Sequence, residues 1–341
     1  MERGIFDFMQ HDSVYKNSQK EWLVTLQQSQ MYWYELLVNE HDEINTRKLI
    51  FSEVKELKKQ VEASLKKRFV YFICSRIKVR FCAETPPVLT PYYGFMKLRV
   101  LIGRDEKIRE FVVPVACDEN YLAILPEIDE TGRFITFCHP SGIKRCFSVH
   151  DYLMTIGVNL GYSTKVEYVG VTKKPQDRPL NGVHGGLGDV LYNVSNEDND
   201  ILIFFNTFKV ITNAEQNKYN INYHIPNSMT DEVKVGKEGE VIEKSFRFYF
   251  DSRTQKRKRA KERKELINDL KNMVHENNIG LLNVLFEVEE DSEYYQFYSS
   301  RVNPRKSHCF TVKISENDLC LEDFEGTFDE FAMRYITEKG V

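Results

Sequence analysis

The segment Tyr168-Val169-Gly170-Val171-Thr172 begins the part of the chain from which we interpret the rest. With Lys165-Val166-Glu167 before it, the segment alternates in apolar and polar residues rich in β-branched and aromatic side chains, which predicts a strand over 165–172. Arg178 and His184 follow, and Glu243 begins an apolar segment further on. A phenol, a guanidinium, an imidazole and a carboxylate are groups that single-metal cleavage of a phosphodiester uses.

The neighbouring segments are predicted from their periodicity. The run Ile201 to Phe205 is continuously apolar, so the strand predicted over 201–211 has the composition of a central strand. Ser148 is an expected N-cap for a short helix over 148–159. The segment that starts at Glu243 is predicted to be a helix that continues into a basic block.

These residues resemble a known family of nucleases. Tyr168-Val169-Gly170, followed by Arg178 eight residues after the glycine, resembles the second half of the signature of the GIY-YIG nuclease superfamily. His184 is similar to the histidine or tyrosine often found on that family's next helix. The segment Glu243-Lys-Ser-Phe-Arg-Phe-Tyr-Phe is similar to its glutamate helix, and Gln255 stands where the family has an asparagine.

The first tripeptide of that signature, Gly-Ile-Tyr, has no clear counterpart. Gly157-Val158-Asn159 lies eleven residues before Tyr168 but has asparagine in the tyrosine position and resembles the end of a helix. The missing strand could instead lie upstream, at 133–138 or 143–148. These placements stay open.

The resemblance implies a fold and a reaction. It implies a small mixed sheet flanked by helices, with Glu243 holding one Mg²⁺ or Mn²⁺, ions that prefer oxygen ligands. Arg178 would bind the phosphate, and Tyr168 or His184 would orient or deprotonate the attacking water. Gly170 would let the backbone turn where a phosphate comes close. The expected activity is metal-dependent cleavage of DNA.

Each of these residues also has a purely structural interpretation. Tyr168 could be a half-buried aromatic residue, Arg178 a surface cation and His184 part of a flexible turn. Glu243 lies four residues before Arg247 and could form an intrahelical ion pair. The alternative function is therefore an inactive nucleic-acid-binding or scaffold protein, or a module of a defence or mobile-element assembly.

The net charge of -4 means that any affinity for nucleic acid comes from local patches. DNA is the expected partner, and RNA stays open as an alternative. The cations expected to contact nucleic acid are Lys173, Lys174, Arg253, Lys256, Arg257, Lys258, Arg259, Lys261, Arg263 and Lys264.

The remaining regions complete an expected α+β fold. Apolar spacing predicts two helices, over 20–38 and 42–67, which offer a surface for a protein partner or a second copy of the chain. We expect a helical region at 1–68, a β-rich region at 69–147, the nuclease-like domain at 148–275, and strands with an acidic amphipathic segment at 276–341.

Composition limits the class of protein. A chain of 341 residues with 42% hydrophobic content can bury a substantial core. The sequence contains neither an apolar run of about 18 residues nor a secretory signal, so we expect no membrane contact and a cytoplasmic location. The seven scattered cysteines suit reduced thiols better than disulfides, and a zinc site at Cys138, His139, Cys146 and His150 is the less favoured alternative.

Overall fold

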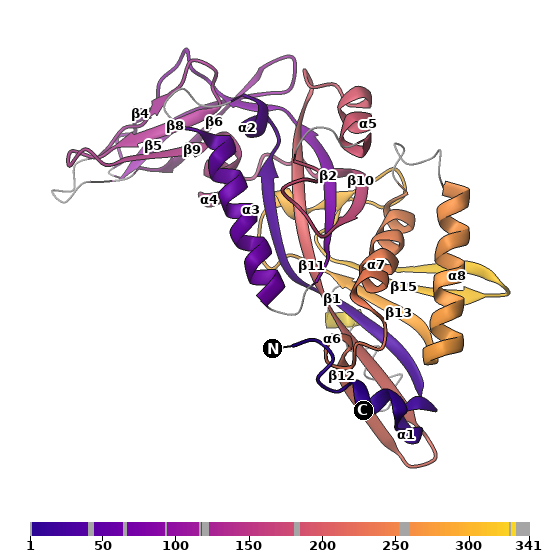
Figure 1. Cartoon of the computed structure of the whole chain (residues 1–341). Coiled ribbons are helices and arrows are strands. Elements are labelled where there is room, and N and C mark those ends of the chain that lie inside the picture. The colour runs from indigo at the N-terminus through magenta and orange to yellow at the C-terminus, as the bar shows by residue number, and fades with distance from the viewer. Residues whose placement is uncertain are drawn as a thin grey trace.

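The computed structural model describes residues 2–39, 44–63, 67–92, 94–115, 117, 123–180, 185–251, 259–326 and 329–331. Its centre is a mixed sheet of nine strands (Figure 1). In spatial order the sheet contains β14 (Phe297–Tyr298), β10 (Thr164–Thr172), β2 (Phe69–Ile77), β11 (Asn199–Gln216), β1 (Gln19–Trp33), β13 (Ile279–Phe286), β15 (His308–Ser315) and β16 (Asp318–Phe324). The ninth strand, β12 (Ile221–Pro226), pairs with β11 beyond the end of β2.

The N-terminal region is not helical as predicted, because residues 19–33 form a central strand. Strand β1 pairs antiparallel with β11 along its whole length and parallel with β13 near its start. Both faces of β1 are partly covered, so its apolar residues do not alternate strictly, and their three- and four-residue spacing imitates a helix. The first of the two expected docking helices is therefore a strand within the sheet.

The expected small sheet flanked by helices is also wrong. The nine-stranded sheet draws strands from each of the four segments into which we divided the sequence, and β10 lies between β2 and β14. Periodicity reports only which residues of one segment share a face, so it could not show that distant segments pair. The observed fold is mostly β.

Helices cover the sheet and its edges (Figure 1). The longer ones are α3 (Thr46–Ala63), α5 (Gly185–Asn193), α7 (Val235–Phe250) and α8 (Arg259–Asn277). Shorter helices are η1 (Asp7–His11), α1 (Ser13–Lys16), α2 (Glu35–Val38), α4 (Val149–Thr155), α6 (Asn227–Thr230) and η3 (Glu293–Tyr295). Ser148 caps α4 as predicted, because its hydroxyl accepts a hydrogen bond from the backbone N–H of Asp151. Among the described residues, no helix combines the length and apolar composition needed to cross a membrane.

Aromatic residues fix α7 on the sheet. Phe246 and Phe250 of α7 lie with their ring centroids 5.3 and 5.6 Å from that of Phe72 on β2. Phe246 also lies 5.4 Å from Phe286 of β13. Each buried phenylalanine side chain is worth about 1.5–3 kcal/mol relative to an exposed one. This packing sets the position of every other residue on α7, including Glu243.

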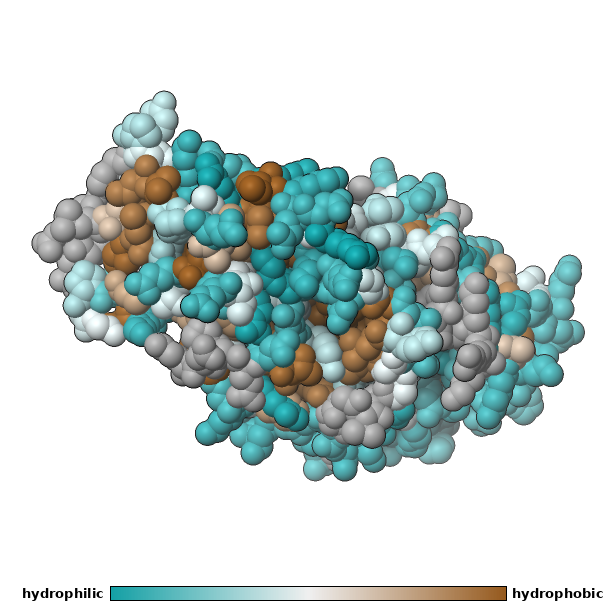
Figure 2. All heavy atoms as spheres, turned by 90° about the horizontal axis from the view of Figure 1, so that it is seen from above, coloured by the Kyte–Doolittle hydropathy of each residue, from teal (hydrophilic) through white to brown (hydrophobic). Residues whose placement is uncertain are grey.

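An outer lobe extends from one end of the sheet (upper left in Figure 1). It contains a sheet of β3 (Val79–Phe81), β4 (Val88–Leu89), β5 (Phe95–Ile102) and β6 (Lys107–Pro114), and a second sheet of β7 (Glu127–Ile128), β8 (Phe134–Cys138) and β9 (Lys144–Ser148). Figure 2 shows apolar residues at the surface of this end of the molecule. The exposed apolar residues of the lobe include Val88, Leu89, Phe95, Ile108 and Val112.

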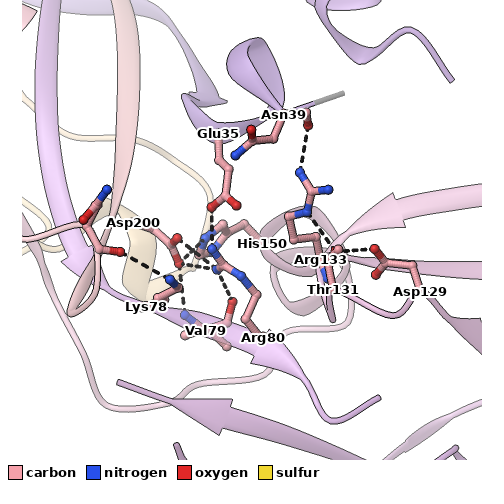
Figure 3. Close-up of polar contacts among 11 residues, drawn as sticks. Glu35, Asn39, Lys78, Val79, Arg80, Asp129, Thr131, Arg133, His150 and Asp200 are labelled. Carbon is pink, nitrogen blue, oxygen red and sulfur yellow. Dashed lines mark hydrogen bonds and ion pairs between the residues drawn. The ribbon is translucent and has the colours of Figure 1, made fainter. Parts of the chain in front are cut away.

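A buried polar cluster around Asp200 joins the lobe to the central sheet (Figure 3). The Asp200 carboxylate accepts hydrogen bonds from the backbone N–H of Val79 at 3.0 Å and from Arg80 at 2.9 Å, and it lies 3.0 Å from Nε2 of His150. Burial alone would raise the pKa of Asp200, but His150 and Arg80 outweigh burial and lower that pKa below its usual value. The Asp200 carboxylate therefore stabilises the point at which the chain passes from β2 into β3.

Replacing Asp200 with alanine should lower the free energy of unfolding at pH 7 by about 3–5 kcal/mol, because Arg80 and His150 lose their buried, charged partner. Urea unfolding would measure the change. Glu197→Ala is the control, since that side chain is 65% exposed and its 3.4 Å pair with Arg104 lies at the surface. The control should lose less than about 1 kcal/mol. Equal losses in the two variants would contradict the role given to Asp200.

Candidate active site

Strands β10 and β2 bring two tyrosines together. The strands are antiparallel, with Tyr168 opposite Ile73 and Gly170 opposite Tyr71 in one continuous register. The rings of Tyr71 and Tyr168 stack with centroids 6.0 Å apart and planes 23° from parallel. Tyr71 is 1% exposed, and Tyr168 is partly buried. The two phenols thus form a single unit on neighbouring strands.

Gly170 makes room for this pair. A Cβ atom at position 170 would lie 2.5 Å from Cζ of Tyr71 and 2.8 Å from Cε1 of Tyr168, closer than side chains can approach. Gly170 therefore accommodates the tyrosine rings, a role different from the predicted turn beside a phosphate.

Glu243 lies on α7, which approaches β10 closely. A Cβ atom at Gly239, one turn earlier, would lie 2.7 Å from Cβ of Arg68 and 3.3 Å from Cγ2 of Val171, so only glycine allows this approach. Glu243 is 3% exposed, and its Oε1 accepts a hydrogen bond from Nη2 of Arg247. The intrahelical pair that the sequence offered as the structural interpretation of Glu243 is therefore present, and it is buried.

Arg247 connects the helix to the strand. Its Nη2 donates to the backbone carbonyl of Val169 at 3.3 Å, and its Cζ lies 6.0 Å from the ring centre of Tyr168. Its Nη1 pairs with Glu262 of α8. One guanidinium thus contacts β10, α7 and α8.

The ionisable groups act on one another. The pKa of Glu243 is raised to about 7, because burial and the charge of Glu262 raise it by more than Arg247 lowers it. Burial also raises the pKa of Tyr71 and Tyr168. Arg178 lowers, and Glu243 raises, the pKa of both tyrosines, so these four residues share one electrostatic neighbourhood.

An open cleft of about 370 Å³ adjoins these residues along the end of β10 and the start of α7. Its charged lining residues are the cations Arg68, Lys173, Lys174 and Arg178 and the carboxylates Asp177 and Glu240. Lys174 pairs with Asp177 at 3.8 Å. A larger cavity of about 580 Å³ lies at the other end of the sheet, between the β11–β12 hairpin and β13, but none of the predicted site residues lines it. Four cations against two carboxylates in its lining make the smaller cleft the better candidate for binding an anion.

The structure brings together only part of the predicted site. Tyr168, Arg178 and Glu243 lie in this neighbourhood, and Lys173 and Lys174 line the cleft. The remaining predicted residues His184, Gln255, Arg253, Lys256, Arg257 and Lys258 lie outside the described residues.

The predicted continuation of the Glu243 helix into the basic block is wrong. Helix α7 ends at Phe250, because Asp251 adopts a left-handed conformation with φ of 48°. Helix α8 then turns its acidic residues toward α7, where Asp269 pairs with Lys237 and Lys244, and Glu262 pairs with Arg247. Three of its predicted DNA-binding cations form ion pairs, Arg259 with Asp251 at 2.8 Å, Arg263 with Asp318 at 2.7 Å and Lys261 with Glu265 at 3.9 Å. Lys261 and Lys264 are exposed.

Tyr71 is the residue that sequence reasoning missed. The missing strand was sought at 133–138, 143–148 or 157–159, but β8 and β9 belong to the outer lobe and Gly157 has a φ of 67° after α4. The strand beside Tyr168 is β2. The aromatic run Phe69-Val70-Tyr71-Phe72 lies in the region predicted to be β-rich, yet nothing local indicates that it pairs with 164–172.

The donors available for a metal ion are few. In the part of the chain that the structure describes, no group of three His, Cys, Asp or Glu side chains is placed to hold a metal ion, and this includes the zinc site considered above. No disulfide links the seven cysteines, all of which are described. The cleft itself is lined by the carboxylates Asp177 and Glu240. The buried Glu243 offers a single hard oxygen ligand, which suits Mg²⁺ because that ion keeps several of its waters. The carboxylate fits such an ion if Arg247 moves from it.

Comparison with known proteins gives no relatives: no protein-family model, no curated protein and no solved structure matches the chain.

Gly170→Ala should destabilise the protein by about 1–3 kcal/mol, because the added methyl group collides with both tyrosine rings. Urea unfolding would measure the loss. Gly188→Ala in α5, where an added Cβ meets nothing within 4 Å, should be neutral or slightly stabilising. Tyr71→Leu in the Gly170→Ala background should recover part of the loss, since the two changes act at one contact. A Gly170→Ala protein as stable as wild type would refute this packing.

Proposed function

We propose that this protein is a metal-dependent endonuclease that hydrolyses phosphodiester bonds of DNA at the cleft between β10 and α7. The observation that supports the proposal is the shared neighbourhood of Tyr168, Arg178 and Glu243, which are far apart in the sequence, beside a cleft rich in cations. This is the residue set that the resemblance to the GIY-YIG nuclease superfamily implies. Tyr71 would take the place of the tyrosine in that family's first tripeptide.

Phosphodiester hydrolysis requires stabilisation of negative charge that develops on the phosphoryl oxygens. Arg178 is exposed at the cleft and permanently charged, so its guanidinium can bind two of these oxygens at once. Arg68, Lys173 and Lys174 would hold the flanking phosphates. Glu243 would hold one Mg²⁺ or Mn²⁺, which when bound supplies Lewis-acid polarisation of the phosphoryl group.

The two tyrosines would position the attacking water. Because burial raises the pKa of Tyr168 above its usual value, the phenol is neutral near pH 7 and acts as a hydrogen-bonding group rather than as a base. The proton of the water then passes to another acceptor. His184, the other candidate that the sequence offers for this role, would be that acceptor, since a free imidazole titrates close to neutral pH.

The direct test is cleavage of supercoiled plasmid DNA in the presence of Mg²⁺. Glu243→Gln and Arg178→Ala should each lower the rate at least about 10²-fold, because each removes a group that meets developing charge. Glu276→Gln on α8 and Arg104→Ala in the lobe are matched controls at exposed positions and should cut like wild type. Thermal unfolding of each variant would separate loss of chemistry from loss of fold. Equal cutting by wild type and Glu243→Gln would reject the proposed reaction.

A second candidate is a nucleic-acid-binding protein of this fold without the chemistry. The ion pair between Glu243 and Arg247 favours it, because a carboxylate that keeps an arginine as its partner holds no metal ion. Binding of DNA without nicking at any concentration of Mg²⁺ or Mn²⁺ would support this alternative.

Both candidates predict binding of nucleic acid in the cleft. Lys173→Ala and Lys174→Ala should each reduce the slope of log K against log salt for duplex DNA by up to about 0.9, the value for one lost phosphate contact. Fluorescence anisotropy between low and moderate salt would measure these slopes. Lys218→Ala, an exposed cation in the β11–β12 turn, is the control and should leave the slope unchanged. Unchanged slopes in the two cleft variants would place nucleic acid elsewhere.

A further inference from the structure

Arg247 is shared between two carboxylates from different helices. It donates to Oε1 of Glu243 on its own helix and to Oε1 of Glu262 on α8. All three side chains are largely buried, with exposures of 14% for Arg247, 5% for Glu243 and 14% for Glu262. The guanidinium therefore divides its hydrogen bonds between two anions.

The contact with Glu262 is incomplete. Nε of Arg247 and Oε2 of Glu262 are both shielded from solvent, and neither has a hydrogen-bond partner within the described residues. A guanidinium and a carboxylate can form two parallel hydrogen bonds, which is a stronger arrangement than one. Transfer of Nη2 from Glu243 to Oε2 of Glu262 would complete that pair through Nη1 and Nη2 and would release Glu243.

The neighbouring cation is not available for the same exchange. Lys244 follows Glu243 directly, but its Nζ pairs with Glu265 at 3.3 Å and Asp269 at 3.1 Å. The acidic residues of α8 are thus divided among three cations of α7, Lys237, Lys244 and Arg247, and Glu262 pairs with Arg247. The Val169 carbonyl, 3.3 Å from Nη2, keeps Arg247 beside β10.

Charge balance requires an exchange if Glu243 binds a divalent ion. A buried carboxylate is unfavourable without a counter-charge, and Arg247 supplies one when no ion is bound. An ion on Glu243 and a guanidinium on the same carboxylate would repel each other in surroundings of low polarity. One of them has to leave, and Glu262 offers the guanidinium a second carboxylate within reach.

We propose that Arg247 is a tethered counter-ion of Glu243 that moves fully to Glu262 when a divalent ion binds, so that Glu262 sets the metal affinity of the site. This inference rests on the proposed role of Glu243 as the metal ligand. It assigns Arg247 and Glu262 positioning roles that do not require contact with the substrate. Without metal, Arg247 occupies the Glu243 carboxylate. When the ion binds, Arg247 pairs with Glu262 of α8 and the Glu243 carboxylate becomes available to the ion.

The test is binding of Mn²⁺ alone to the full chain without nucleic acid, followed by electron paramagnetic resonance of the free ion. Glu262→Gln should weaken Mn²⁺ binding about 10- to 100-fold, as removal of a supporting partner of a metal ligand commonly does. Glu265→Gln removes the same charge one turn away on α8 and should change affinity only slightly. Glu243→Gln should abolish binding at this site.

The decisive comparison is made without the arginine. Arg247→Met should bind Mn²⁺ at least as tightly as wild type, and adding Glu262→Gln to it should have no further effect. A full loss of affinity from Glu262→Gln in the Arg247→Met background would overturn the proposal, because Glu262 would then act directly on the ion. If Arg247→Met does not fold, Arg247→Gln makes the same comparison. Unchanged affinity in the single Glu262→Gln variant would overturn the proposal as well.

The outcome separates this inference from the proposed reaction. Coupled effects of Arg247 and Glu262 on Mn²⁺ binding in a protein that cuts no DNA would support the exchange and reject the nuclease. Binding by Arg247→Met but not by wild type would overturn the exchange, because the arginine would then stay on Glu243 in the presence of the ion. Absence of Mn²⁺ binding in both proteins would overturn the exchange together with the metal-binding role of Glu243.

Discussion

The antiparallel pairing of β2 with β10 is the constraint on which the candidate site depends. It sets Tyr71 opposite Gly170, stacks Tyr71 on Tyr168, and leaves the outer side of β10 for α7 to approach. Two glycines make the arrangement possible, Gly170 under the tyrosine rings and Gly239 where the helix meets Arg68 and Val171. The backbone pairing of β2 with β10, together with glycine at positions 170 and 239, thus brings the side chains of β2, β10 and α7 together at the candidate site.

The electrostatics of the site follow from this close packing. Because α7 approaches β10 and α8, the charged residues of α7 are withdrawn from water and need partners. Lys244 and Arg247 find them on α8, and the acidic side of α8 consequently faces inward. Glu243 shares its partner Arg247 with Glu262, and burial raises the pKa of Glu243 to about 7. A ligand ion gains the most binding free energy beside a charge that is unpaired or incompletely paired in such surroundings.

Local patterns in the sequence predicted local structure well. The strand at 165–172, the cap at Ser148 and the helical segment around Glu243 all have counterparts in β10, α4 and α7. The errors occurred where tertiary packing overrides spacing. Residues 19–33 form a strand because neighbours on both sides bury them, and their helical spacing is incidental. For the site, residue types indicated Tyr168, Arg178 and Glu243, but Tyr71 and Glu262 act only through pairings between distant segments, which a single sequence does not report.

The outer lobe begins and ends at adjacent points of the same sheet. The chain leaves β2 near Ser75 and returns as β10 at Lys165, and these two residues lie opposite each other. A segment with neighbouring entry and exit points can be lengthened, replaced or lost in evolution without rewiring the strands around it. The distance in sequence between the two tyrosines is therefore free to drift, while their distance in space is fixed by hydrogen bonds. Descendants of a common ancestor could share this site yet differ widely in the spacing of its parts.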